Sequence, residues 1–314
     1  MSRLSAPPSQ SGPSVTPAPA ENRLLGILCA IVTVTIWASW VVATRYAVTT
    51  RFTAVDLGLI RFIVPFVVLA PVWIKRGIWP RGLPVITGLL IVGGSGVTYS
   101  LVVATALKFA PASHVGTLLP GVMSIWAVLI GVAVFGEKPG VIRWVGYGVI
   151  AVGIAILTAL QPGEADRASV IIGYALLVGA ALMWACYTHA LRRSGLTAID
   201  AAAFTGFWSF VSFAVIALFT GTTIADAPLN DLLVQLLFQG VLSGVVAVVT
   251  YGIAVRNIGS TGAAAFGALT PAFAALGGVF LLGELGSISL ILAVALVIVG
   301  VMIASGVASK LLRR

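Results

Sequence analysis

The chain has 314 residues, of which 60% are hydrophobic and only 9% are charged, and its mean hydropathy is +1.12. A soluble domain carries about 25% charged residues, so this chain cannot cover itself with a surface suited to water, which excludes most soluble enzymes, nucleic-acid-binding proteins and secreted disulfide scaffolds. We therefore predict an integral membrane protein, whose net charge of +9 reports its topology in the bilayer.

Residues 1–22 differ in composition from the rest of the chain, with five prolines, five serines and no apolar run. Such a segment is expected to form a disordered tail. The first apolar run begins at Leu24 and exceeds 20 residues, whereas the apolar core of a secretory signal has about 7–15. We therefore expect this first run to remain in the protein as a membrane helix.

Ten apolar runs follow one another along the chain, separated by short polar or Gly/Pro breaks. A helix needs about 20 mainly apolar residues to cross a bilayer, and a barrel strand needs only about 9–11, so these lengths favour helices. The short connections leave no room for a domain outside the membrane, and we expect the function to be performed inside the bundle. The predicted spans are 24–48, 56–74, 83–107, 112–135, 141–160, 170–191, 199–220, 231–255, 261–282 and 287–308.

The basic residues predict the orientation of the spans. With the N-terminus inside, 13 of the 18 Lys and Arg residues fall on the cytoplasmic side, so the positive-inside rule places both termini in the cytoplasm of a multi-pass protein of the bacterial inner (plasma) membrane. Arg61 is expected near the outer surface, where its side chain would snorkel toward water; alternatively, it pairs with Asp56 or attracts an anionic group. The five basic residues on the outer side are Arg45, Arg51, Arg61, Lys108 and Arg167.

The sequence contains an internal repeat with an offset of 147 residues. Trp37 matches Trp184, and the Gly-Glu step at 136–137 matches the step at 283–284. Each half holds five predicted spans, an odd number, so the second half must enter the membrane from the opposite side. We therefore predict two inverted five-helix repeats around a central cavity, residues 23–162 and residues 163–314, the second ending in a short basic tail.

A resemblance to a known family rests on these same residues. The ten-span layout, the run Trp37-Ala38-Ser39-Trp40 followed by Ala43-Thr44-Arg45, and the twin Gly-Glu steps resemble the EamA-type members of the drug/metabolite transporter superfamily, most closely the YddG-type bacterial aromatic amino acid exporters. Pro271 precedes the second step as in the family, whereas Pro120 lies about one helical turn farther from the first. The resemblance covers roughly residues 24–308 and implies the fold and the export of metabolites.

Aromatic and hydroxyl side chains inside the spans are the candidate substrate-binding residues. Trp37 and Trp40 share one face of the first helix, and rings can stack on a planar substrate while hydroxyls bind an ammonium or carboxylate group. Plain helix packing is the alternative role for each of them. Pro120 and Pro271 are candidate hinges, because proline removes a helical hydrogen bond. The candidate binding residues are Trp37, Trp40, Ser95, Thr98, Tyr99, Trp184, Tyr187, Ser243, Thr250 and Tyr251.

The charges and cysteines limit the chemistry. No Asp or Glu lies at the centre of a span, which argues against carboxylate-mediated exchange of protons for organic cations and favours uncharged or zwitterionic solutes. Cys29 and Cys186 lie in apolar runs, so we expect no disulfide, no metal site and no cofactor. The sequence has no phosphate-binding GxxxxGK[ST] loop, so ATP is not expected to drive transport directly.

These observations predict a secondary transporter that works by alternating access and exports aromatic or neutral amino acids. Cationic drugs, nucleotide sugars and purines are the alternative substrates. An intramembrane enzyme would need a catalytic constellation at depth, and a channel would need a polar filter around a symmetry axis; the spans provide neither. The expected partners are a small-molecule substrate and the lipid bilayer, with no nucleic acid. We expect a monomer, with a dimer as the alternative.

Overall fold

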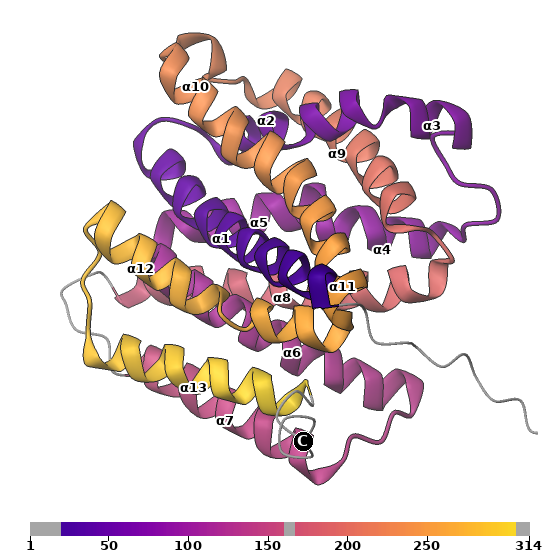
Figure 1. Ribbon diagram of the computed structural model, residues 1–314. Coiled ribbons are helices and arrows are strands. Elements are labelled where there is room, and N and C mark those ends of the chain that lie inside the picture. The colour runs from indigo at the N-terminus through magenta and orange to yellow at the C-terminus, as the bar shows by residue number, and fades with distance from the viewer. Residues whose placement is uncertain (1–19, 160–166, 306–314) are drawn as a thin grey trace, which may run out of the picture.

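The computed structural model describes residues 20–159 and 167–305, which form a bundle of packed helices (Figure 1). A 3-10 turn, η1 (Ile224–Asp226), and a π-helical segment, η2 (Leu236–Val246), interrupt the α-helices. The α-helices are α1 (Ala20–Thr50), α2 (Ala54–Val68), α3 (Ala70–Arg76), α4 (Val85–Ser95), α5 (Val97–Phe109), α6 (Ala112–Phe135), α7 (Val141–Ala159), α8 (Arg167–Ser194), α9 (Ala198–Thr220), α10 (Leu229–Gln235), α11 (Ala247–Gly267), α12 (Thr270–Leu282) and α13 (Ile288–Ala304).

The helices account for the ten predicted spans. Eight segments are long and apolar enough to cross a membrane, and α2 with α3 forms a ninth that is bent by 67°. The apolar helix α13 has 17 residues and occupies the tenth predicted span. The all-helical membrane fold is therefore confirmed. Residues 1–19 of the predicted tail lie outside the described residues, as do the last residues of two predicted spans and the basic C-terminal tail, while α1 already begins at Ala20.

Besides the bent second span, three of the predicted spans are broken or distorted, which their composition did not show. The third span divides at Gly96 into α4 and α5, and a Cβ at this glycine would lie 2.1 Å from the hydroxyl of Ser209. The eighth contains the π segment η2. The ninth begins after Gly259, whose φ of 77° favours glycine, and breaks again before α12. These interruptions depend on contacts with other helices, so apolar length alone cannot predict them.

The two halves end their fourth spans in the same way. Gly136 closes α6 and Gly283 closes α12, both in the left-handed conformation. The following glutamate donates its N–H to a carbonyl six residues back, Glu137 to Gly131 and Glu284 to Gly278, at 3.0 Å in each case. In both halves a left-handed glycine therefore ends the helix, and the bond from the next residue is one residue longer than the 6→1 bond of a Schellman motif. The twin Gly-Glu steps are thus the same structural element, used twice.

The repeated elements face opposite ends of the bundle. The Glu284 carboxylate accepts hydrogen bonds from the backbone N–H groups of Ala112 and Ser113, at 2.5 and 2.9 Å. The end of α12 therefore lies at the beginning of α6, so the two helices run antiparallel, as inverted halves require. We call the two ends of the bundle the Glu284 end and the Glu137 end. The first helix of each half packs on helices of the other half: α1 lies on α11 and α12, and α8 lies on α4, α5 and α6.

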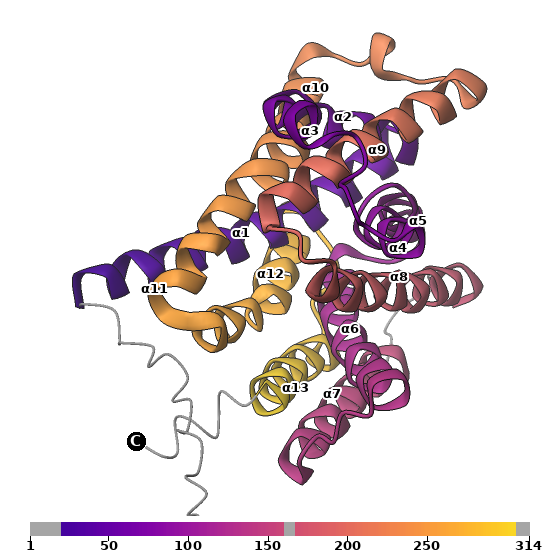
Figure 2. The ribbon, with the colours of Figure 1, turned by 90° about the vertical axis from the view of Figure 1, so that its right-hand side faces the viewer.

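The last helices of the two halves, α7 and α13, pair along the edge of the bundle (Figure 2). Glycines bring their backbones together: a Cβ at Gly146 would lie 2.5 Å from the Ala304 nitrogen, and one at Gly300 would lie 2.8 Å from the Gly146 oxygen. Such close approach is the usual packing device of membrane helices. It joins the two halves at the edge of the bundle, where both helices also pack on α6.

Replacing Gly146 by Ala should lower the thermal unfolding midpoint in detergent, because the new methyl group meets backbone atoms that cannot move aside. Overpacking of this kind costs about 1–3 kcal/mol. Gly148 on the same helix has no neighbouring atom within 4 Å of a built Cβ, so Gly148→Ala is the matched control and should leave the midpoint unchanged or raise it. Equal midpoints for the two variants would contradict this account of the α7–α13 contact.

Candidate functional site

The candidate residues gather into three groups, the first of which lies between α1 and α11. The rings of Trp37 and Tyr251 are 5.4 Å apart between centroids. The hydroxyls of Thr33 and Thr250 are 2.7 Å apart, and Thr250 also bonds the Val246 carbonyl. These contacts join the first helix of one half to the third span of the other. Thr33 is buried, and the half-buried side chains of Trp37, Thr250 and Tyr251 make a mixed aromatic and hydroxyl surface beside it.

The second group lies between α5 and α8. Tyr99 and Trp184 have ring centroids 5.1 Å apart, and Trp184 and Tyr187 are separated by the same distance. Tyr99 is only 3% exposed, whereas Trp184 and Tyr187 are half-buried. Gly94 allows α4 to approach, because a Cβ there would meet the Tyr187 Cβ at 2.7 Å. Three aromatic rings thus form a continuous row in the interior.

The third group is a hydrogen-bond network around Trp40. The indole Nε1 of Trp40 donates to Gln239 Oε1 at 2.6 Å, and Gln239 Nε2 donates to the Thr44 hydroxyl at 2.9 Å. Thr44 in turn donates to the Trp40 carbonyl, and Gln239 also donates to Gln235 at 3.3 Å. Gln235 and Gln239 are each 1% exposed. Because each partner holds the next, the network fixes the orientation of the Trp40 indole.

The guanidinium of Arg61 lies over the Trp40 ring, 4.7 Å from its centroid. Its Nη1 is shielded from solvent and has no hydrogen-bond partner. The expected snorkelling to the membrane surface is therefore wrong, because Arg61 extends into the bundle. Pairing with Asp56 is also excluded, since the Asp56 carboxylate accepts hydrogen bonds from Thr53 and Thr223 instead.

Four of the predicted residues do not join these groups as partners: Thr98, Ser243, Pro120 and Pro271. Thr98 is exposed although it is next to Tyr99, whereas the Ser95 hydroxyl donates to the Ile91 carbonyl of its own helix and also interacts with the side chain of Tyr187. Ser243 is buried in η2, and its hydroxyl has no partner. Pro120 lies inside the continuous helix α6, whereas Pro271 occupies the first turn of α12, where proline is tolerated. Their predicted hinge role stays a prediction.

The π-helical segment η2 explains how Gln239 and Ser243 come to lie inside the bundle. Gly240 and Gly244 of η2 pack on α2, where Cβ atoms would lie 3.0 Å from the Ile60 oxygen and 3.6 Å from the Arg61 oxygen. π-Helical turns inside α-helices are rare and occur frequently at functional sites. The distortion therefore places a glutamine and a serine beside the helix that carries Arg61.

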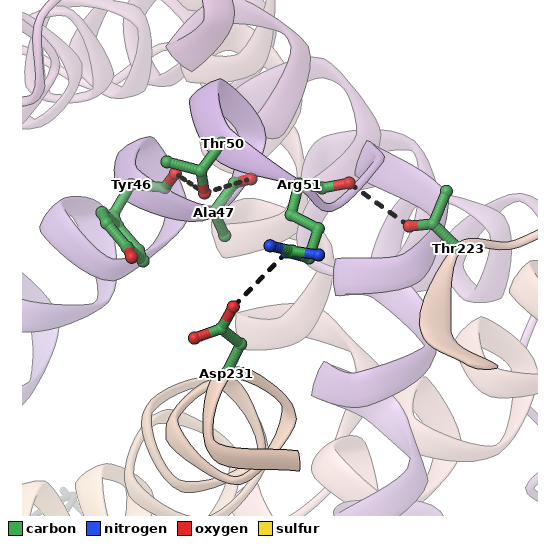
Figure 3. A network of polar contacts seen from close by, with 6 residues as sticks. All are labelled: Tyr46, Ala47, Thr50, Arg51, Thr223 and Asp231. Carbon is green, nitrogen blue, oxygen red and sulfur yellow. Dashed lines mark hydrogen bonds and ion pairs between the residues drawn. The ribbon is translucent and has the colours of Figure 1, made fainter. Parts of the chain in front are cut away.

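Polar contacts between the halves close the Glu284 end. The Nε of Arg51 is 3.5 Å from an Asp231 oxygen, and the Thr223 hydroxyl lies 3.3 Å from the Arg51 carbonyl (Figure 3). The same hydroxyl is 2.8 Å from the buried Asp56 carboxylate. Arg45 donates to the Leu107 carbonyl at this end. Together with the bonds from α6 to Glu284, these contacts tie α1, α2, α6, α10 and α12.

Two cavities lie beside the site rather than within it. One of about 610 Å³ opens at the Glu137 end between α3 and the start of α9, where Arg76 is 3.4 Å from Asp200. The other, of about 370 Å³, lies between α1, η2 and α12 and includes Gln235. None of the ten candidate binding residues lines either cavity. Within the described ranges, no group of three His, Cys, Asp or Glu side chains could hold a metal ion.

Sequence reasoning did not place Arg61 or Gln239 among the candidate binding residues. Gln239 shares a helical face with Ser243, and the sequence indicates this polar face only as part of the cavity wall. Its partner Trp40 is 199 residues away, however, and this pairing becomes visible only in the fold. Arg61 follows Asp56 closely at the start of a span, which suggested a surface position. Nothing in that spacing shows that the guanidinium turns inward over an indole.

Replacing Gln239 by Leu should destabilise the protein by about 1–3 kcal/mol, because the buried Trp40 Nε1 loses its acceptor. Thermal unfolding in detergent measures the loss. Trp40→Phe provides the control, since phenylalanine needs no acceptor. In that background Gln239→Leu should cost less, and the difference gives the coupling between the two side chains. Equal costs in both backgrounds would show that the bond does not stabilise the fold.

Comparisons with known proteins agree with this architecture. One solved structure, titled only "Crystal structure of protein", is similar in fold with a TM-score of 0.62 at 20% identity, over 93% of this chain and 99% of that chain. Comparison with curated proteins gives no significant match. The profile of the EamA-like transporter family matches residues 24–159 and again residues 171–306, one copy for each half. The chain is therefore a multi-pass membrane protein that belongs to the EamA-like transporter family, whose members are transporters and not enzymes.

Proposed function

We propose that this transporter exports aromatic or neutral amino acids across the bacterial inner membrane by alternating access. The resemblance of its sequence to the YddG-type exporters supports this proposal. One observation carries the substrate class: Trp40, Tyr99 and Trp184 belong to a single packed cluster, beside the polar network of Gln239 and Thr44. Rings of this kind stack on planar or apolar side chains. Hydroxyl and amide groups beside them suit the polar end of an amino acid.

A difference between the two ends supports alternating access. At the Glu284 end α1 packs on α5 and α6, and the Glu284 carboxylate bonds the start of α6. At the Glu137 end no comparable packing joins α8 to α11 or α12 in the described part of the chain, and Glu137 is exposed. A transporter with two alternating states needs two inverted halves, with the path closed at one end and open at the other. The difference between the Glu284 end and the Glu137 end fits this requirement.

The basic residues favour one orientation for this arrangement. The positive-inside rule places both termini and the Glu137 end in the cytoplasm, so the path would be open toward the inside and closed toward the outside. An exporter loads its solute from that side. The described acidic residues lie near helix ends or in loops, which favours movement of a neutral or zwitterionic solute down its gradient. A single chain contains both halves, so we expect it to work as a monomer.

Transport into proteoliposomes containing the purified protein tests the substrate class. Labelled aromatic and neutral amino acids should move saturably, with and without a pH gradient. Replacement of Trp37, Trp184 or Tyr99 by Ala should reduce this movement about two- to tenfold, because stacking contacts of about 0.5–1.5 kcal/mol are removed. Trp144→Ala is the matched control, since Trp144 is 44% exposed on the peripheral helix α7, and should transport normally.

If amino acids do not move but a cationic drug, a nucleotide sugar or a purine does, the substrate proposal fails while the family assignment stands. Size-exclusion profiles and thermal midpoints of the variants must match those of the wild type. If a variant loses transport and its thermal midpoint also falls, the side chain acts in helix packing and not in substrate binding.

The closure of the Glu284 end can be tested with a buried reporter. Thr117 is 0% exposed on α6, so a Thr117→Cys reporter, with Cys29 and Cys186 replaced by Ala, should react slowly with a membrane-impermeant thiol reagent. Glu284→Gln should speed this reaction about three- to tenfold, because the charge that stabilises the start of α6 is lost. Glu137→Gln makes the same change at the other end and should leave the rate unaltered. Equal effects of the two variants would contradict the proposed closure.

A further inference from the structure

Arg61 carries a positive charge in the interior with no counter-ion. The two ion pairs in the described part of the chain join Arg51 to Asp231 and Arg76 to Asp200, so neither involves it. Asp56, the acid nearest to it on α2, is occupied by Thr53 and Thr223. The guanidinium therefore depends on groups other than carboxylates for its stabilisation.

The groups around Arg61 compensate only part of its charge. The guanidinium carbon lies 4.7 Å from the Trp40 ring centroid and 5.7 Å from that of Phe62, and Tyr99 lies in its surroundings. Each aromatic face contributes about 0.5–2 kcal/mol to binding a cation, whereas an unpaired buried charge costs several kcal/mol. Burial of Nη1 without a partner adds to this cost. The site lacks an anionic group.

The aromatic support of Arg61 is held in place before any ligand arrives. Gln239 accepts from the Trp40 indole and donates to Thr44, which donates to the Trp40 carbonyl. The Trp40 ring can therefore not rotate without breaking this chain of bonds. Arg61 as a whole is half-buried, so it keeps some accessible surface. A charged donor on a fixed platform is preorganised for binding.

We propose that Arg61 binds the carboxylate of the transported solute, and that it thereby selects solutes with a carboxylate and an apolar or aromatic remainder. This inference rests on the proposed function and names the group that fixes the solute. A guanidinium fork matches a carboxylate with two parallel hydrogen bonds. The row of rings from Tyr99 to Tyr187 would contact the remainder of the solute, since Tyr99 belongs to both the row and the surroundings of Arg61.

Equilibrium binding to the purified full chain tests this inference with L-phenylalanine, L-phenylalaninamide and phenylethylamine as labelled probes. The wild type should bind the acid more tightly than the amide or the amine. Arg61→Gln should weaken binding of the acid about tenfold or more, because a charge-assisted bond is lost, and should change binding of the amide by no more than about twofold. The preference for the acid should then disappear.

Two further variants separate binding from folding. Arg143→Gln makes the same substitution at an exposed position of the peripheral helix α7 and should bind all three probes like the wild type. Arg61→Lys keeps the charge without the fork and should give an intermediate affinity. Because Arg61→Gln removes an unpaired buried charge, its thermal midpoint should equal or exceed that of the wild type. A ligand site that costs stability is the expected result.

The outcomes distinguish this inference from the proposed function. If Arg61→Gln binds the acid as the wild type does, or loses the acid and the amide alike, the inference is wrong even where amino acid transport is found. If the wild type binds no amino acid but binds benzoate in a manner that depends on Arg61, the inference stands and the proposed substrate class fails. Stronger binding of inorganic phosphate than of benzoate would overturn the assignment to carboxylates.

Discussion

A helix that begins within a bilayer leaves its first N–H groups without water to bind. In this chain α6 begins at Ala112, and a carboxylate from the other half, that of Glu284, accepts two of these groups. The contact joins α6 to α12 directly. The first helices of the two halves then pack on this pair, α1 on α12 and α8 on α6. The same Gly-Glu element exists at the other end, where its carboxylate is exposed. The Glu284 carboxylate therefore satisfies the first N–H groups of α6 and also joins the two halves. Because Glu137 makes no such contact with the described residues, the two ends of the bundle differ.

The ten spans and the duplication could be predicted because both can be recognised from the sequence without knowledge of contacts between distant residues. Apolar length shows a membrane helix, and the Gly-Glu steps match at the same offset of 147 residues as Trp37 and Trp184. The breaks could not be predicted, since each depends on a remote partner. Gly96 is the clearest case: the hydroxyl of Ser209, from the other half, occupies the space where a side chain would begin. The sequence at Gly96 alone shows only a glycine among apolar residues.

The site could be predicted in its residue types but only partly in its geometry. Trp37, Trp40 and Trp184 were found because helical spacing places aromatic residues on one face. Thr98 shows the weakness of this reasoning, because α5 buries the side of Tyr99 and leaves its neighbour exposed. Arg61 shows a second weakness. Depth in a bilayer was inferred from distance to the end of an apolar run, whereas the direction of the side chain depends on which helix packs beside it.

The duplication did not copy the charge of Arg61. The stretch of the second half that corresponds to its position, residues 208–213, has the sequence WSFVSF and contains no basic residue. The helices are therefore related by an approximate twofold symmetry, whereas the charges in the interior are not. A solute with one acidic end and one apolar end would meet a site with a matching polarity, and it would be held in a single orientation. Every such molecule would then be carried with the same end toward α2.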